Sequence, residues 1–260
     1  SSLADLPAGT GLGSSGSYLI GLLMALSHYK RELVTLQQLA EIACHLEIDV
    51  LKKPVGKQDQ YMATFGGLTS LEIAKDGQVT VTPLVKGTSS LAEFVANTHM
   101  YYTGFRRDAL EVLHDQNRAL EADKDPQRGQ VEDSLKRIHE LGFEIKDAIA
   151  SDNYDRWGEL LHTHWTHKKN LSSKISLTRV DQIYDEVRRD YNVLGGKISG
   201  AGGGGFLMLY CTGNHKRLES YMASQNMPRL HYNIESQGTK VVADLGPGMD
   251  QAQAILGERS

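Results

Sequence analysis

The feature that most constrains this chain is a glycine-rich segment near its start. Residues 7–17 read Pro-Ala-Gly-Thr-Gly-Leu-Gly-Ser-Ser-Gly-Ser and run directly into an apolar helical stretch. Glycines allow the backbone to turn tightly, so that several N–H groups can face one point. The first turn of the following helix adds unpaired amides and the positive end of the helix dipole. The segment therefore predicts a site for nucleotide phosphates, and Ser14 and Ser15 offer hydroxyl ligands to a Mg²⁺ that bridges those phosphates.

Other interpretations of this loop are possible. Residues 11–16 spell G-x-G-x-x-G, but dinucleotide binding needs a strand after the helix, and residues 35–51 read as another helix. A Walker A loop needs a lysine that is absent here. A glycine turn that merely caps a helix stays open on the glycines alone. The order P-x-x-x-G-L-G-S-S, however, resembles motif 2 of the GHMP kinases, such as galactokinase, homoserine kinase and mevalonate kinase. That resemblance implies ATP contacts at Pro7, Gly9, Gly11, Leu12, Gly13, Ser14, Ser15 and Gly16.

The composition excludes several other classes of protein. The chain has 260 residues, a formal net charge of −4 and no long basic run, so it offers no electrostatic support for nucleic-acid binding. Cys44 and Cys211 are far apart in the sequence, which favours free thiols in a reducing compartment. The apolar run over residues 18–26 is too short to span a membrane and is not preceded by the basic region of a signal peptide. We therefore expect a cytoplasmic protein.

Two carboxylates form the second signal. Asp59 lies between two glutamines in the run Pro-Val-Gly-Lys-Gln-Asp-Gln-Tyr over residues 54–61, and Glu47 lies upstream of it. An aspartate in isolation more often caps a helix. The pair nevertheless resembles the galactokinase-like pattern Glu…Gly-x-x-Asp-Gln. This resemblance implies that Glu47 binds Mg²⁺ together with Ser14 and Ser15, and that Asp59 is the catalytic residue that acts on the substrate hydroxyl as base or orienting group. Phosphoryl transfer needs both functions.

A second glycine loop follows much later, as Lys-Ile-Ser-Gly-Ala-Gly-Gly-Gly-Gly over residues 197–205. A flexible linker is the simplest interpretation. A buried-strand pattern over residues 206–211 comes directly after it, however, so the glycines belong to a packed domain. The segment resembles motif 3 of the same kinases and would allow the backbone to approach the first loop and the substrate. The resemblance implies substrate contacts at Gly200, Ala201, Gly202 and Gly203.

Further segments resemble one branch of the superfamily, the D-glycero-D-manno-heptose 7-phosphate kinases. They are residues 55–61, 101–107 and 160–172. We expect Arg107 and Lys168 to bind a phosphate at one end of the substrate, although basic pairs are usually solvated surface residues. Gly56, Lys57 and Gln58 are also expected at the substrate. His162, His164 and His167 are scattered around a helix, which does not favour a metal site.

The resemblance implies an α+β fold in two lobes. Residues 1–90 would form an incomplete N-terminal lobe with the ATP loop, and residues 91–260 a C-terminal lobe with a ferredoxin-like core and extra helices. Because the loop follows the N-terminus at once, we expect the chain to begin within its first domain, without motif 1. We predict a linker over 87–90 and a hairpin that turns at Asp76-Gly77. Predicted helices are 17–29, 35–50, 107–120, 127–150, 154–165, 178–191 and 215–225; predicted strands are 68–73, 79–84, 94–102, 206–211 and 240–245.

The leading hypothesis is an ATP- and Mg²⁺-dependent kinase that phosphorylates the anomeric hydroxyl of heptose 7-phosphate. Its partners would be a small sugar phosphate and ATP, with no nucleic acid and no membrane; a homodimer stays open. A kinase for an unphosphorylated sugar such as fucose is one alternative. A sugar sensor without catalytic activity on the same scaffold is another, but the presence of Glu47 and Asp59 argues against it.

Overall fold

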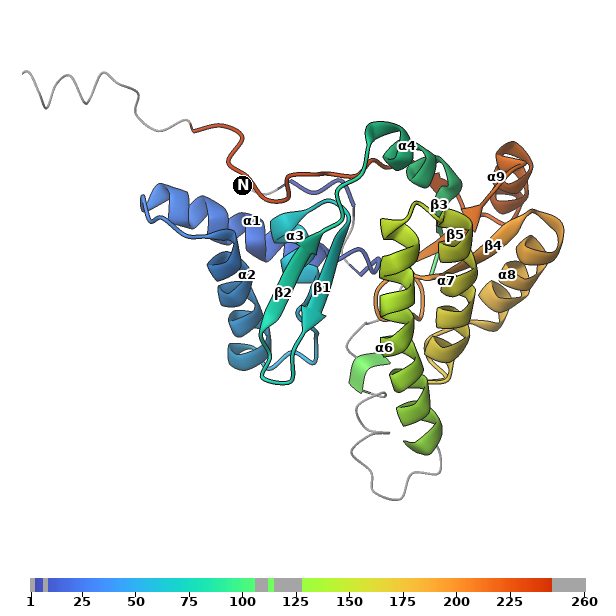
Figure 1. Ribbon diagram of the computed structural model, residues 1–260, viewed down its shortest axis with the longest axis horizontal. Helices are drawn as coiled ribbons and strands as arrows, with labels where there is room; N and C mark the ends of the chain where they lie inside the picture. The colour runs from blue at the N-terminus through green and yellow to red at the C-terminus, as the bar shows by residue number, and fades with distance from the viewer. Residues whose placement is uncertain (1–2, 7–8, 106–111, 115–127, 245–260) are drawn as a thin grey trace, which may run out of the picture.

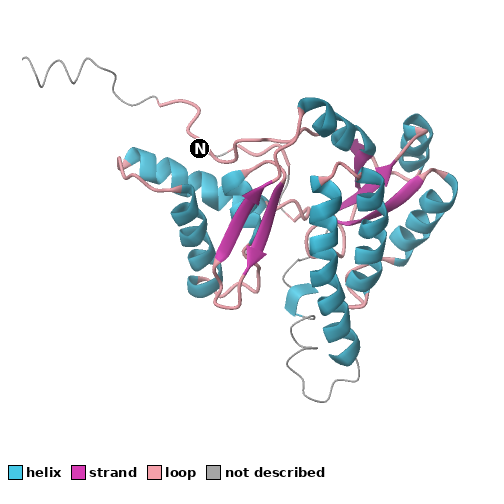
Figure 2. Cartoon of the chain, viewed as in Figure 1, coloured by secondary structure: helices cyan, strands magenta, loops and turns pink. Residues whose placement is uncertain are grey.

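The computed structural model describes residues 3–6, 9–105, 112–114 and 128–244. Its elements form two lobes that lie side by side (Figures 1 and 2). Both lobes combine helices with an antiparallel sheet, which confirms the α+β class. The predicted division at residue 90 falls within helix α4 (Thr88–Asn97) and stays a prediction.

The first lobe packs a group of helices against a β-hairpin. Thr35 and Gln38 form the predicted capping box at the start of α2. Leu39 and Ala43 then lie on the buried face of α2, where they pack against Ile20 of α1. The hairpin turns where predicted, with the amide of Gln78 donating to the side chain of Asp76. The elements are α1 (Ser14–Tyr29), α2 (Leu36–Cys44), the π-helix η1 (His45–Val50), α3 (Gln58–Phe65), β1 (Thr69–Ile73) and β2 (Val79–Pro83).

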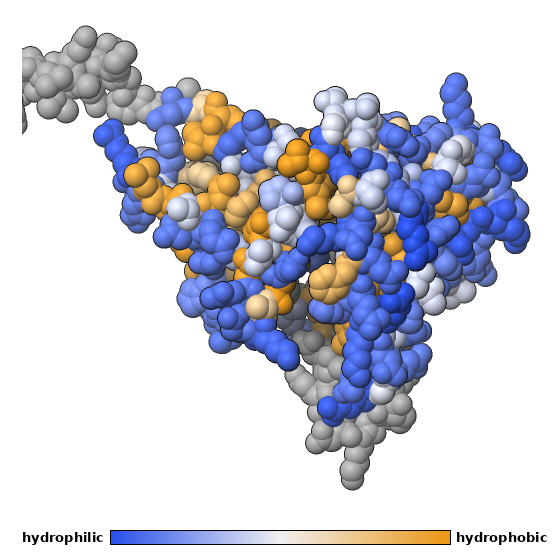
Figure 3. Space-filling model, viewed as in Figure 1, coloured by the Kyte–Doolittle hydropathy of each residue, from blue (hydrophilic) through white to orange (hydrophobic). Residues whose placement is uncertain are grey.

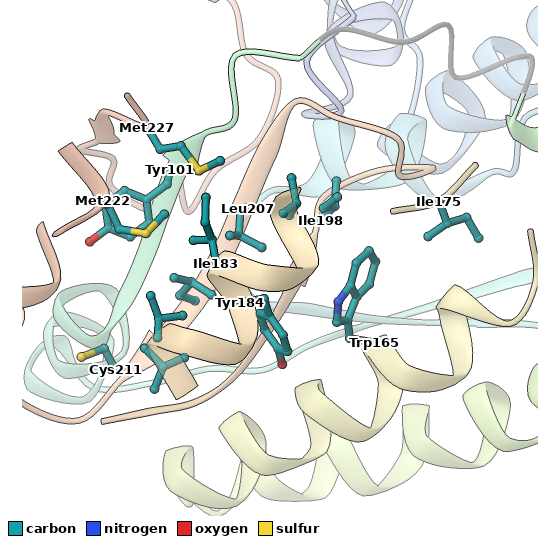
Figure 4. Packing of buried hydrophobic residues seen from close by; sticks show 14 of the residues in the cluster. Tyr101, Trp165, Ile175, Ile183, Tyr184, Ile198, Leu207, Cys211, Met222 and Met227 are labelled. Carbon is teal, nitrogen blue, oxygen red and sulfur yellow. The ribbon is translucent and has the colours of Figure 1, made fainter. Parts of the chain in front are cut away.

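The second lobe is built on a four-stranded antiparallel sheet with the order β4-β5-β3-β6. This order is that of a ferredoxin-like fold, as the resemblance implies. Helix α7 packs between α6 and the sheet, and its Trp165 lies beside Ile175 and Ile198 in the core (Figure 4). The elements after α4 are β3 (Thr98–Tyr102), α6 (Arg128–Ala150), α7 (Tyr154–Lys169), α8 (Thr178–Asp190), β4 (Val193–Ile198), β5 (Phe206–Cys211), α9 (His215–Ser224) and β6 (Arg229–Leu230).

Several sequence predictions are wrong. Residues 88–97 are helical, so neither the linker at 87–90 nor the first half of the strand at 94–102 is correct. An apolar run as short as the one around Phe94 fits a helix or a strand. Strand β4 was missed because Gly195 and Gly196 are poor strand formers.

Residues 240–244 contain no strand, and the sheet ends instead on the short β6. The helix predicted over 35–50 is α-helical to Cys44 and continues as η1. Most of the helix predicted over 107–120 lies outside the described residues.

After β6 the chain returns from the second lobe to the first, across the top of the view in Figure 1. The amide of Gly67 donates to the carbonyl of Glu235 (2.7 Å), and that of Thr239 donates to the carbonyl of Thr64 (3.2 Å). Apolar side chains reach the surface on the first lobe, as Figure 3 shows. Leu22 and Leu26 of α1 are among the exposed apolar residues of this lobe. In the described part of the chain, no helix is long and apolar enough to cross a membrane.

Candidate active site

The first glycine loop leads into α1 at Gly13, whose backbone is left-handed (φ 69°). No side chain of the described residues caps this helix. Within the described residues, no group accepts a backbone hydrogen bond from the amides of Ser14, Ser15 or Gly16. These amides and the positive end of the dipole of α1 are the arrangement that binds an anion. Phosphate binding by the loop stays a prediction.

The second glycine loop, residues 199–205, lies directly against the first. A Cβ atom at Gly11 would be 2.7 Å from the carbonyl oxygen of Ser199, and one at Gly200 would be 2.8 Å from the Cα of Gly11. The carbonyl of Thr10 likewise occupies the space that a side chain at Gly205 would need. The close approach of the two loops that the sequence predicts is therefore present, and it depends on the absence of side chains.

Asp59 lies in the first turn of α3, beside the first loop. A Cβ atom at Gly13 would be 3.4 Å from the Cγ of Asp59, and one at Gly16 would be 3.2 Å from its Cβ. Asp59 remains exposed to solvent. Partial burial of its carboxylate raises the pKa of Asp59; a contact with Gln58 (3.5 Å) lowers it and the negative charge of Glu47 raises it further. A carboxylate with a raised pKa is a better proton acceptor.

Glu47 is 3% exposed and is surrounded by donors. Its Oε1 accepts hydrogen bonds from the Ser15 hydroxyl (2.7 Å) and from Lys53 Nζ (2.8 Å), and its Oε2 accepts from Gln60 Nε2 (2.5 Å). Burial alone raises the pKa of Glu47, but these hydrogen bonds outweigh burial and lower it. The side chain belongs to η1, and π-helical turns are frequent at functional sites. Glu47 is therefore held as an anion next to the start of α1.

The residues around Glu47 have the chemistry of a magnesium site. Mg²⁺ prefers carboxylate and hydroxyl oxygens and usually keeps several waters. Glu47 and Ser15 supply those two oxygens within 2.7 Å of each other, and the ammonium of Lys53 already places a positive charge on the same carboxylate oxygen. Ser14 follows the N-cap of α1, one residue before Ser15. The predicted ligands thus fit a divalent cation, although metal binding stays a prediction.

Sequence reasoning missed Lys53 and Gln60. Gln60 is buried and fixes the second oxygen of Glu47; its place directly after Asp59 in the Asp-Gln pair was the available signal. The ammonium of Lys53 lies 3.4 Å from the Ser15 hydroxyl and also donates to Glu47. Nothing in the local sequence distinguishes it from the exposed Lys52, since only the folded loop brings it to the carboxylate.

The remaining predicted substrate residues lie in different environments. Lys57 donates to the carbonyl of Gly77 in the hairpin turn (2.5 Å), Gly56 is exposed, and Gln58 contacts Asp59. Lys168 donates to the carbonyl of Gly200 in the second loop (2.5 Å).

In the second loop, Gly202 and Gly203 pack against Ile175, with the Gly203 amide donating to the Ile175 carbonyl (2.7 Å), and Ala201 packs against the core. Pro7 and Arg107 lie outside the described residues. Gly9 and Leu12 complete the first loop. Substrate binding by these residues stays a prediction.

A hollow of about 440 Å³ lies between α1, α3 and the returning C-terminal segment. Ile20, Met62 and Thr239 are among its lining residues. Ser17, which directly follows Gly16, also lines the hollow, but among the described residues none of the predicted site residues does.

Comparisons with known proteins identify the family of the chain. The family described as GHMP kinases N terminal domain matches residues 3–67, and GHMP kinases C terminal matches residues 145–228. The chain is 30% identical over 210 residues to D-glycero-alpha-D-manno-heptose 7-phosphate kinase of Campylobacter jejuni, covering 80% of this chain and 59% of that protein. It is 28% identical over 211 residues to L-fucokinase/L-fucose-1-P guanylyltransferase of Bacteroides fragilis, covering 80% of this chain and 21% of that protein.

Among solved structures, a D-glycero-D-manno-heptose 1-phosphate kinase from Bacteroides thetaiotaomicron has a TM-score of 0.65 at 21% identity. The match covers 92% of this chain and 66% of that one, and at this identity it shows the fold alone. The two-lobed fold of the chain is therefore that of this structure. The family matches make the assignment specific: the chain belongs to the GHMP kinases. It spans about three fifths of the length of the C. jejuni relative.

Proposed function

We propose that this protein transfers the γ-phosphoryl group of ATP to the anomeric hydroxyl of D-glycero-D-manno-heptose 7-phosphate. The observation that carries the proposal is the position of Asp59 against Gly13 and Gly16, at the unpaired amides of α1, with Glu47 hydrogen-bonded to Ser15. The 30% identity to a heptose 7-phosphate kinase supports the choice of substrate.

The residues divide the chemistry between them. The amides at the start of α1 would bind the ATP phosphates, and Glu47 with Ser15 would hold Mg²⁺, which neutralises charge on the phosphate oxygens. Asp59 would accept the proton of the attacking hydroxyl. A new bond then forms between the sugar oxygen and the γ-phosphorus, the bond from that phosphorus to the β-phosphate oxygen breaks, and ADP leaves.

The substrate carries a second phosphate at its far end, and this dianion needs charged partners. We propose Arg107 and Lys168 for this role, as an arginine suits a bidentate contact and a lysine acts as a point charge. The hydrogen bond from Lys168 to Gly200 supports this assignment, because it holds the ammonium at the loop that touches Gly11.

The test is an ADP-release assay of the full-length protein with heptose 7-phosphate, unphosphorylated heptose and L-fucose, with the product located by ³¹P NMR. We expect turnover of the sugar phosphate. Asp59→Asn should lower kcat by about 10²–10⁴-fold, as for a lost general base, while ATP still binds. Asp49→Asn is the matched control, since Asp49 is exposed and pairs with His45 on the surface (2.9 Å).

Other results would change the conclusion. Preference for unphosphorylated sugar would favour a fucokinase-like enzyme, in line with the similarity to the B. fragilis protein. Sugar binding without any phosphoryl transfer by the unmodified protein would indicate a sensor. Normal turnover by Asp59→Asn would show that Asp59 has no catalytic role and only begins α3.

A further inference from the structure

A group of basic side chains lies where α7 packs against β4. His164 and Lys168 are one turn apart on α7 and share one side of that helix. Lys197 follows Gly195 by two residues on β4, so both positions lie on the same face of the strand. At Gly195 this face touches the backbone of α7, which occupies the space that a Cβ atom would need. The three basic groups therefore meet between helix and strand.

These groups have no acidic partner in the part of the chain that the structure describes. Within the described residues, neither Lys168 nor Lys197 forms an ion pair, whereas the neighbouring Lys169 pairs with Asp181 at 3.0 Å. The Nδ1 atom of His164 is buried without a hydrogen-bond partner. Among the described residues, Lys168 donates to the carbonyl of Gly200. Within the described residues, two ammonium groups without a carboxylate partner thus lie beside a buried ring nitrogen that has no hydrogen bond.

The electrostatics agree with this description. Burial, and then the charge of Lys197, lowers the pKa of Lys168 to about 7. Burial lowers the pKa of Lys197. Burial, followed by Lys197, Lys168 and His167, lowers the pKa of His164 to about 3. A nearby carboxylate would act in the opposite direction. In the free protein these groups destabilise one another's charged forms, and a bound anion would relieve that repulsion.

We propose that His164, Lys168 and Lys197 form a phosphate-binding subsite whose ligand is the phosphate group of the acceptor sugar. This inference rests on the proposed function and adds Lys197 and His164 to Lys168. The location supports it, because Lys168 holds Gly200, and Gly200 lies against Gly11 of the first loop. The three basic side chains are half-buried, and Gly200, whose carbonyl accepts from Lys168, is exposed.

The nucleotide is the other source of a phosphate near this junction, and the experiment separates the two. The protein is saturated with Mg²⁺ and the ATP analogue AMP-PNP, and heptose 7-phosphate, inorganic phosphate or unphosphorylated heptose is then titrated by calorimetry. The variants are Lys197→Met and Lys168→Met, which keep an apolar side chain and remove the charge. Lys136→Met is the matched control, because Lys136 is exposed on α6, and its contact with Asp133 is a surface ion pair (3.8 Å).

We expect both variants to bind heptose 7-phosphate and inorganic phosphate about 10-fold to 100-fold more weakly, the range for a lost charge-assisted contact. Binding of AMP-PNP and of unphosphorylated heptose should stay within twofold of the unmodified protein, as should every affinity of Lys136→Met. Unchanged affinity for the sugar phosphate would overturn the subsite. An equal loss of AMP-PNP affinity would assign the cluster to the nucleotide and overturn the acceptor assignment.

Folding and function can be distinguished within the same series. Removing an unpaired, half-buried charge should leave the thermal midpoint unchanged or raise it; if Lys197→Met unfolds, Lys197→Gln and His164→Asn repeat the test. If the unmodified protein binds inorganic phosphate through Lys197 but does not phosphorylate heptose 7-phosphate, the proposed function fails and the subsite stands. Turnover of heptose 7-phosphate with an unchanged KM in both variants would support the proposed function and overturn the proposed subsite.

Discussion

Lys53 and Ser15 both donate to the Oε1 atom of Glu47, the side chain proposed to bind Mg²⁺. The ammonium therefore already compensates the negative charge that would attract the metal. We predict that Lys53→Met binds divalent cations about tenfold more tightly in the absence of nucleotide, because a charge-assisted hydrogen bond no longer competes. Mn²⁺ binding followed by electron paramagnetic resonance measures this directly. Lys30→Met is the control, since Lys30 pairs with Glu32 on the surface (3.7 Å).

Glu47→Gln should have the opposite effect on the metal. The amide is neutral and leaves Lys53 without its partner, so Mn²⁺ affinity should fall and the Mg²⁺ concentration needed for half-maximal turnover should rise. Equal Mn²⁺ affinity in the unmodified protein, Lys53→Met and Glu47→Gln would mean that the cluster around Glu47 stabilises the fold and holds no metal.

At the scale of elements, the contact between the two glycine loops is the feature most sensitive to a single methyl group. Gly11 has a left-handed backbone (φ 76°), and a Cβ atom there would meet Ser199 of the second loop at 2.7 Å. Gly9 has nearly the same backbone (φ 78°) but open space around it. Both alanine variants therefore carry the backbone strain, of order 1–3 kcal/mol, and Gly11→Ala alone also separates the loops.

We predict that Gly11→Ala lowers ATP affinity well beyond the change in Gly9→Ala, measured by calorimetry, and that it also lowers the thermal midpoint further. Similar losses in the two variants would show that the loop contact contributes nothing beyond local backbone strain.

At the scale of the whole molecule, the segment after β6 connects the second lobe back to α3 of the first. Gly238 has a left-handed backbone (φ 62°), and the carbonyl of Thr64 fills the space of its missing side chain. Gly67, in the same contact, has a similar backbone (φ 66°), but a Cβ atom there would be no closer than 3.8 Å to its nearest neighbour, the carbonyl oxygen of Ser236. Gly238→Ala should therefore displace the segment, whereas Gly67→Ala should add strain alone.

The expected result for Gly238→Ala is a thermal midpoint several degrees below that of Gly67→Ala, since a further loss of about 1 kcal/mol shifts the midpoint of a chain this size by about 2–4 °C. Differential scanning calorimetry should also show a broader or split transition as the lobes become less coupled. Coincident midpoints for the two variants would mean that the returning segment does not hold the lobes together.

Local signals predicted much of the fold. The capping box at Thr35, the hairpin turn at Asp76-Gly77 and the helical spacing of α6 each depend on residues close in sequence, and all three are present. The errors arise where distant contacts decide. Gly195 lies in a strand where the backbone of α7 occupies the space that a side chain would fill. Residues 94–97 are helical, although the apolar run around Phe94 fits the spacing of a helix or of a strand.

The sequence by itself determined that the chain has two glycine loops, a carboxylate pair between them and the order of motifs of a GHMP kinase. Tertiary structure alone decided that the loops touch, that Lys53 and Gln60 hold Glu47, and that Lys197 meets Lys168 and His164. The physical reason is the distance along the sequence between the interacting groups. Turn and helix preferences are set by neighbouring residues, but hydrogen bonding to a buried charge and repulsion between unpaired charges depend on which distant groups packing brings together.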